Sequence, residues 1–216
     1  MRVGNYSYVN AGDMPETIPV FPLSGALLLP GGQMPLNIFE PRYLAMIDHA
    51  LAGDRLIGMV QPALDGTENG LCNVGCIGRI CSFAETGDGR YHITLAGVCR
   101  FRIVEEPSAK APWRQVRIAP FLSDLETPDG KEVDRDSLLR AFKSFLDANS
   151  MEADWESVNR ADNVTLVNAL SMMSPYGPAE KQALLEAADL KARAETLVAL
   201  TEIMLARNGD MGSTLQ

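Results

Sequence analysis

The chain has 216 residues, of which 46% are hydrophobic and 22% are charged, and its formal net charge is −9. This length suits one large domain or two small ones, each able to bury a core, and the composition excludes a disordered chain. The acidic balance, with a pI near 4.7, disfavours a broad nucleic-acid surface. The sequence also lacks the run of about 18 apolar residues that a membrane helix needs, so we expect no contact with a membrane.

Residues 1–16 contain a single Arg and no apolar stretch, so they do not have the pattern of a secretory signal. We expect them to be a flexible lead-in, and we expect a cytoplasmic location. In that reducing compartment the cysteines would stay thiols. Their spacings differ from the paired C-x₂-C of zinc sites, so we expect small apolar core residues and no metal. The cysteines are Cys72, Cys76, Cys81 and Cys99.

Residues 17–127 are expected to form a β-rich subdomain, because their short apolar runs are separated by Gly and Pro. Apolar and polar residues alternate in several runs, which is typical of half-buried antiparallel strands. Asp88 and Gly89 suit a hairpin turn. The succession of short strands predicts a barrel or a rolled sheet. The expected strands span 18–23, 26–30, 55–62, 74–84, 90–97, 98–106 and 113–121.

The stretch "MPLNIFEPRYLAMIDHAL", residues 34–51, crowds charged and aromatic side chains around a proline. Pro41 suits the first position of a helix, where its missing N–H costs nothing. Glu40 stands at the helix entrance, where a carboxylate can interact with the exposed N–H groups. Tyr43 begins an apolar stripe on the helix. We therefore interpret Glu40, Pro41, Arg42 and Tyr43 as a structural motif and not as an active site.

Residues 128–208 are expected to form a helical subdomain, followed by a flexible tail over 209–216. Apolar residues recur at helical spacing, "SPYGP" (174–178) interrupts the pattern, and Pro178 suits the start of a third helix. A fourth helix would end near "RNGD" (207–210) with a Gly stop. Four helices joined by short loops predict a small bundle packed beside the sheet.

Residues that could support catalysis or RNA binding are few. The two histidines, His49 and His92, lie outside any recognised nucleophile motif. Four of the five lysines fall in or beside the polar faces of expected helices, so we expect no desolvated general-base lysine. A cluster of arginines on the expected strands is better explained by ion pairs with the many carboxylates, because interleaved aromatics are sparse. These are Arg79, Arg90, Arg100 and Arg102.

A family resemblance rests on "IPVFPLSGALLLPGGQMPLNIFEPRYLAMIDHAL" (18–51), "NVGCIGRI" (73–80), "DGRYHITLAGVCRFRI" (88–103) and "EKQALLEAADLKARAETL" (180–197). In this order these segments resemble the N-terminal substrate-binding domain of Lon proteases, over about residues 17–207. The resemblance implies an α+β fold, with a PUA-like antiparallel β pseudo-barrel followed by the four-helix bundle. Lon proteases continue into ATPase and peptidase domains, whereas this chain stops and has no G-x-x-x-x-G-K-[ST] loop. We expect a stand-alone form that is not an enzyme and needs no cofactor.

The function implied is a non-catalytic module that binds unfolded or extended polypeptide segments, with a separate protease as a second partner in an adaptor or regulator role. A hydrolase with an unrecognised active site and an RNA-binding PUA-like protein are the alternatives. The apolar stretch 25–39 holds more large side chains than one sheet face can bury. We therefore take Leu28, Met34, Leu36 and Ile38 as candidate protein-binding residues. The opposing interpretation, that the helical subdomain covers this face, stays open.

Overall fold

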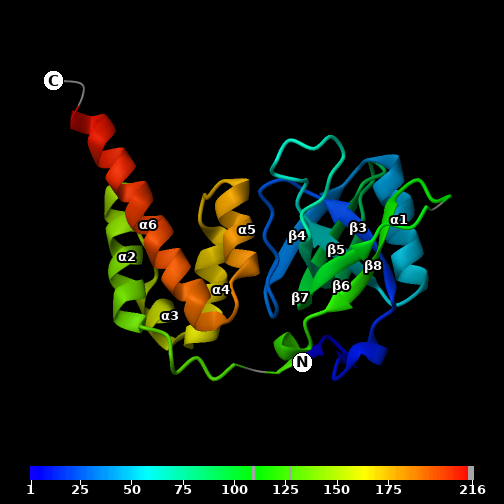
Figure 1. The fold of residues 1–216 in the computed structure, drawn as a ribbon, viewed down its shortest axis with the longest axis horizontal. Coiled ribbons are helices and arrows are strands. Elements are labelled where there is room, and N and C mark those ends of the chain that lie inside the picture. Colours follow the sequence, from blue (N-terminus) through cyan, green and yellow to red (C-terminus); the bar gives the residue numbers. More distant parts are fainter. Residues whose placement is uncertain (109, 127, 214–216) are drawn as a thin grey trace. The chain divides into compact units, whose positions relative to one another are not determined.

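The structure is a computed structural model that describes residues 1–108, 110–126 and 128–213 (Figure 1). The chain divides into two compact units. The first unit, here the β unit, comprises Met1–Thr127 and Tyr176–Leu185, and the second, here the helical unit, comprises Pro128–Pro175 and Glu186–Gln216. Every helix in the described residues is too short or too polar to cross a bilayer.

The β unit is built on a sheet that has six strands within the described residues, in the order β4-β7-β6-β5-β3-β8. β8 also pairs with β7, which closes the sheet into a barrel. All neighbours are antiparallel except β3 and β5, so the expected α+β class with a mainly antiparallel barrel is confirmed. The strands are β3 (Thr17–Pro22), β4 (Gln33–Ile38), β5 (Leu56–Val60), β6 (Val74–Glu85), β7 (Tyr91–Glu105) and β8 (Arg114–Pro120).

The barrel interior is filled by β-branched and aromatic side chains from every wall. Ile18, Val116 and Phe101 are among its fully buried members. Cys76 and Cys99 are 1% and 0% exposed, as expected of small apolar core residues. The same expectation is wrong for Cys72, which is half-buried, and for Cys81, which is exposed. Burial raises the pKa of the Cys99 thiol to about 12, so this sulfur stays protonated and unreactive at neutral pH.

Three of the expected strands differ from the structure. The run 26–30 is not a strand, although Leu27, Leu28 and Leu29 are all buried. Turns at both ends hold it, with the Ala26 N–H donating to the Leu23 oxygen and the Gly32 N–H to the Leu29 oxygen. An apolar run that is buried on all sides has no periodicity to reveal its backbone conformation. The segments 90–97 and 98–106, expected as two strands, form the single long strand β7.

The N-terminal residues are ordered, so the expected flexible lead-in over 1–16 is wrong. They form a small hairpin, β1 (Arg2–Val3) with β2 (Tyr6–Ser7), and a short 3₁₀ helix, η1 (Ala11–Asp13). Tyr8 is 1% exposed and lies in the barrel core together with Val3 and Met14. The Met1 ammonium donates a hydrogen bond of 2.6 Å to the backbone oxygen of Leu125, in η2 (Leu122–Leu125). Sparse but well-spaced apolar residues anchor this segment.

Helix α1 (Pro41–Ala52) begins with Pro41 at its first position, as expected. The Glu40 carboxylate does not bond to the helix N–H groups, however, and that part of the prediction is wrong. It accepts a hydrogen bond from Arg42 Nε at 2.9 Å instead, while the Glu40 backbone oxygen receives the N–H groups of Tyr43 and Leu44. Both side chains of this ion pair are about half exposed, so it stabilises the fold weakly.

The helical unit contains α2 (Arg135–Ala148), α3 (Trp155–Arg160), α4 (Asn163–Met173) and α6 (Leu190–Ser213), and Figure 1 shows α2 and α6 side by side. It differs from the expected four-helix bundle, because α3 was not foreseen and α5 (Pro178–Glu186) belongs almost entirely to the β unit. The expected Gly stop near 209 is also wrong, since α6 continues to Ser213. Of the expected tail 209–216, residues 214–216 lie outside the described part of the chain.

Helix α5 is fixed to the barrel by side-chain amides and by a hydrogen bond from the buried Arg100. Gln61 Nε2 donates to the Pro178 oxygen at 2.8 Å and to Gln182 Oε1 at 3.1 Å, and Gln182 donates to the Val74 oxygen. Arg100, which is 4% exposed, bonds both Asp124 and the Leu185 oxygen. These buried bonds between polar groups explain why α5 packs with the barrel.

Candidate functional site

Three strands extend past the closed barrel and form a small sheet of their own. β5 accompanies β6 only from Cys76 to Arg79, so within the described residues the later part of β6 pairs with β7 alone. β4 likewise pairs only with the first part of β7, through Gln33 to Ile38. We call this region the open sheet end and define it as β4 with residues 80–85 of β6 and 91–97 of β7. It has two faces and two outer edges.

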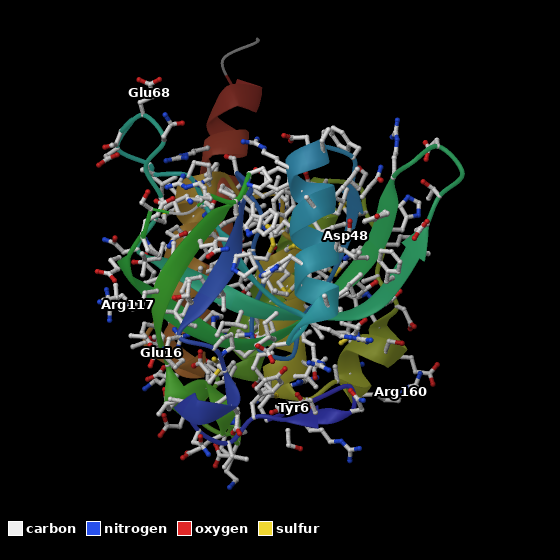
Figure 2. All side chains as sticks on the ribbon, turned by 90° about the vertical axis from the view of Figure 1, so that its right-hand side faces the viewer. Tyr6, Glu16, Asp48, Glu68, Arg117 and Arg160 are labelled. Atoms are coloured by element: carbon white, nitrogen blue, oxygen red, sulfur yellow. The ribbon has the colours of Figure 1, made fainter. Side chains whose placement is uncertain are left out.

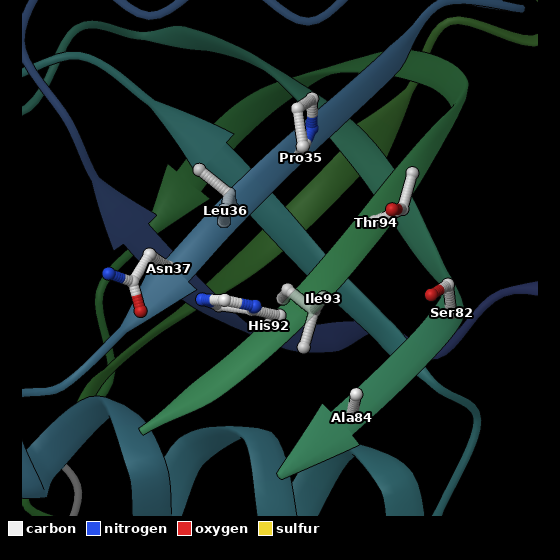
Figure 3. Close-up of a pocket in the computed structure, with 8 residues that line it drawn as sticks. All are labelled: Pro35, Leu36, Asn37, Ser82, Ala84, His92, Ile93 and Thr94. Carbon is white, nitrogen blue, oxygen red and sulfur yellow. The ribbon is translucent and has the colours of Figure 1, made fainter. Parts of the chain in front are cut away.

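One face of the open sheet end is a shallow groove with a volume of about 390 Å³ (Figure 3). Cross-strand register places Pro35, Thr94 and Ser82 in one row. Asn37, His92 and Ala84 form the next row. The groove is therefore lined mainly by small and polar side chains. Its lining comprises Pro35, Leu36, Asn37, Ser82, Ala84, His92, Ile93 and Thr94.

The other face carries the larger side chains, because side chains alternate along a strand. In register, Leu36 lies opposite Ile93, which lies opposite Phe83. The Phe83 ring meets the Tyr91 ring edge-to-face, with centroids 4.9 Å apart. Tyr91 donates a hydrogen bond to Asp48 of α1, a residue labelled in Figure 2. This bond is the main reason that the pKa of the Tyr91 phenol is raised, so the hydroxyl stays protonated.

The structure separates the four candidate protein-binding residues into two kinds. Leu28 and Ile38 are each 1% exposed and belong to the core, so a partner cannot contact them, and naming them was wrong. Met34 and Leu36 are partly exposed and lie on the same face of β4. Because side chains alternate along β4, Ile38 shares the face of Met34 and Leu36, but of the three it alone is buried. Leu28 belongs to the 26–30 run, which is not a strand, and its side chain lies beside Gly78 of β6.

The start of β4 is fixed by an unusually close backbone approach at Gly97. The Gly31 N–H donates to the Gly97 oxygen, and the Gly97 N–H donates to the Gly32 oxygen. A Cβ at position 97 would lie 2.0 Å from the Leu29 oxygen, which no side chain tolerates. Glycine therefore allows the buried 26–30 run to cross β7 and deliver β4 to the sheet edge.

Two exposed aromatic residues lie at this site, of which sequence reasoning missed Phe83, whereas Phe39 ends the apolar stretch 25–39. Phe83 is 38% exposed on β6, and Phe39, which follows β4, is 61% exposed. Arg90 lies 5.8 Å from the Phe39 ring centroid and also pairs with Asp88 at 3.0 Å. An apolar residue within the "SFAE" stretch (82–85), beyond the barrel-forming part of β6, was the available signal. Nothing in the sequence shows where β5 stops pairing with β6.

Other candidate groups have structural partners or lie apart. Arg100 is buried against Asp124, and burial of its charge is more than offset by that carboxylate, so the pKa of Arg100 is raised. No group of three or more His, Cys, Asp or Glu in the described residues could hold a metal ion. Contrary to expectation, Lys181 is only 4% exposed, and burial lowers its pKa to about 8. It lies on α5 and not in the open sheet end.

The chain forms a mainly antiparallel barrel with an open sheet end, followed by helices. Comparison with known proteins identifies the class of domain that has this architecture. The model of the ATP-dependent protease La (LON) substrate-binding domain matches residues 17–202, so the chain belongs to this family. The resemblance seen in the sequence is confirmed.

Related proteins and structures agree with this assignment. Lon protease 2 of Myxococcus xanthus is 28% identical over 203 residues, and Lon protease of Parabacteroides distasonis is 32% identical over 195 residues. These matches cover 89% and 85% of this chain, which spans about a quarter of the length of these curated relatives. The Lon N-terminal domain protein of Xanthomonas campestris matches with a TM-score of 0.62 and 23% identity, over 85% of this chain and 97% of that one. The last likeness shows the fold.

Proposed function

We propose that this chain is a non-catalytic polypeptide-binding module that captures unfolded or extended segments at the open sheet end. The observation that carries the proposal is the partly exposed Met34 and Leu36 on an edge strand that pairs on one side only. An exposed apolar surface beside unpaired backbone suits clients of varied sequence. The name of the matched family, a substrate-binding domain, supports the same role.

The alternatives find less support in the geometry. Arg100, one of the four arginines considered for RNA, is 4% exposed and cannot reach a phosphate. Lys181 is buried, but it lies on a helix that joins the barrel, away from the groove. We expect the purified chain to hydrolyse neither ATP nor casein, and activity that co-purifies with the protein through several columns would contradict this.

The function is tested by capture of reduced and carboxymethylated α-lactalbumin, which cannot fold. We expect Leu36→Asp and Met34→Asp to weaken capture by about tenfold or more, because a large apolar contact is worth roughly 1.5–3 kcal/mol. Gln33→Asp, exposed on the same strand but on its other face, is the matched control. Should the aspartate variants unfold, Leu36→Ser and Met34→Ser provide the milder comparison.

Equal capture by all folded variants would overturn the assignment of the surface, and no capture by the wild type would overturn the function. The adaptor role is a further part of the proposal. Crosslinking in a native extract followed by a pull-down should recover a client together with a protease. A cytoplasmic location stays a prediction that cell fractionation tests.

A further inference from the structure

The outer edge of β6 carries backbone groups that face away from β7. The Ile80 N–H donates to the Arg55 oxygen at 2.8 Å, outside the β6–β7 pair, whereas the Thr86 N–H donates to the Arg90 oxygen at 2.8 Å, inside it. An irregularity between Ile80 and Ser82 separates these two registers. Backbone groups in an antiparallel ladder alternate in direction. Counting back from Thr86, those of Glu85 and Phe83 point outward.

This edge is open in the described structure. Residues 81–85 are all exposed, and their only strand partner among the described residues is β7. The opposite edge of the same sheet is less suited to pairing, because Pro35 stands in the middle of β4 and has no N–H to donate. β3 and β8 have neighbours on both sides. The outward groups of Phe83 and Glu85 are thus spaced for one short extended strand.

The side chains along this edge define which strand would fit. Phe83 and Glu85 are two residues apart and share a face, where Phe83 offers an exposed aromatic edge. No Lys or Arg of the described residues lies within ion-pair distance of Glu85. The nearby Asp48 is a second carboxylate on this face, bonded to Tyr91. Along β6, the apolar contact offered by Phe83 is therefore followed two residues later by the negative charge of Glu85.

We propose that the β6 edge at residues 83–85 binds an extended polypeptide by adding it as a further strand, antiparallel like the neighbours of β6. Because an antiparallel client meets Glu85 before Phe83, the edge selects a Lys or Arg followed two positions later by an apolar residue. The apolar side chain lies against Phe83, the cation lies beside Glu85, and the residue between them turns toward the small Ala84 side of the sheet. This proposal rests on the proposed function and specifies both the chemistry of the client and the way its backbone is held.

The test uses fluorescein-labelled ten-residue peptides, of Ser and Thr apart from one Lys-Thr-Ile or one Glu-Thr-Ile segment, and fluorescence anisotropy with the full chain. We expect the Lys peptide to bind about threefold more tightly than the Glu peptide at low salt, with the difference shrinking as salt rises. Glu85→Lys should reverse this preference. Glu68→Lys makes the same charge change on a loop that Figure 2 shows on the other side of the β unit from the hairpin formed by β6 and β7. This variant should leave the preference for the Lys peptide intact.

Backbone methylation of the peptide tests the strand geometry. Methylation of the amide that faces β6 should weaken binding by about tenfold, and methylation of the next amide should change it little. A flat methylation scan, or a preference that Glu85→Lys does not reverse, overturns the inference. If α-lactalbumin is still captured in that case, the proposed function stands without it. The other strand that could pair here is that of a second copy of the chain. The inference is also overturned if the chain binds no peptide but forms a dimer at the concentrations used, and if Phe83→Pro dissociates that dimer.

Discussion

At the scale of single residues, Gly97 has the least freedom to change among the residues that build the open sheet end. Because Gly97 has no side chain, the Leu29 oxygen can pack against its backbone. A Cβ at position 97 would lie only 2.0 Å from that oxygen. We expect Gly97→Ala to lower the free energy of unfolding by about 3 kcal/mol, since β7 and the 26–30 run must both move. Gly87→Ala, where an added Cβ meets nothing within 4 Å, should stay within about 0.5 kcal/mol in the same urea titration. Equal losses would contradict this reading of Gly97.

Lys181 gives a residue-scale prediction about pH. Burial lowers its pKa from 10.5 to about 8, so between these two values the unfolded chain holds a proton that the folded chain has lost. Stability therefore rises with pH across this window. We expect Lys181→Met, which fills a similar volume without a charge, to be more stable than the wild type at pH 7, on the order of 1–3 kcal/mol.

The advantage of Lys181→Met over the wild type should shrink between pH 8 and pH 10. Chemical denaturation of both proteins at each pH measures it, and the difference between them cancels the titration of the tyrosines. An advantage that does not change with pH would show that the native lysine keeps its ordinary pKa.

At the scale of elements, aspartates cap helices of the helical unit, and three of these caps have a lowered pKa. Asp134, Asp154 and Asp162 accept backbone N–H groups of α2, α3 and α4. Hydrogen bonds from Ser137, Ser157 and Thr165 lower the pKa of these carboxyls below 3.8. A lowered pKa means stability that is present above about pH 4 and is lost as the pH falls through the folded-state pKa.

Replacing all three aspartates with asparagine separates the hydrogen bond from the charge. Asparagine caps a helix as well as aspartate does but has no proton to gain. We expect the melting temperature of the triple variant to fall less between pH 7 and pH 3 than that of the wild type, as followed by circular dichroism. An equal fall in both proteins would assign acid sensitivity to other carboxylates.

Sequence patterns predicted several elements, including the buried strands β3 and β5, whose short apolar runs are bounded by turn residues. β3, β5, β6 and β8 were found near their observed bounds, and so were α1, α2, α4 and α5. The patterns failed where tertiary packing decides. The all-buried 26–30 run has no period, and the six-residue α3 is too short to show one. That α5 packs with the barrel depends on the Gln61 and Gln182 amides, which no local pattern predicts.

At the scale of the whole molecule, family membership was predictable because ordered landmarks extend over most of the chain, whereas the candidate site was only half predictable. Met34 and Leu36 are partly exposed and stay candidates, but Leu28 and Ile38 are core residues. Phe83 and Glu85 were missed, since an open edge is a property of strand pairing. The length of each pairing is fixed by packing across the barrel and has no signature along the chain.

Hydrogen–deuterium exchange of the full chain, with and without carboxymethylated α-lactalbumin, tests most directly whether the open sheet end captures unfolded polypeptide. In the free protein the outward amides of Phe83 and Glu85 should exchange quickly, because they face solvent. With the client bound, we expect slower exchange in residues 33–38 and 81–86 and little change in α2, α4 and α6. Binding that protects only the helical unit, or a client that does not bind, would contradict the proposed function of the open sheet end.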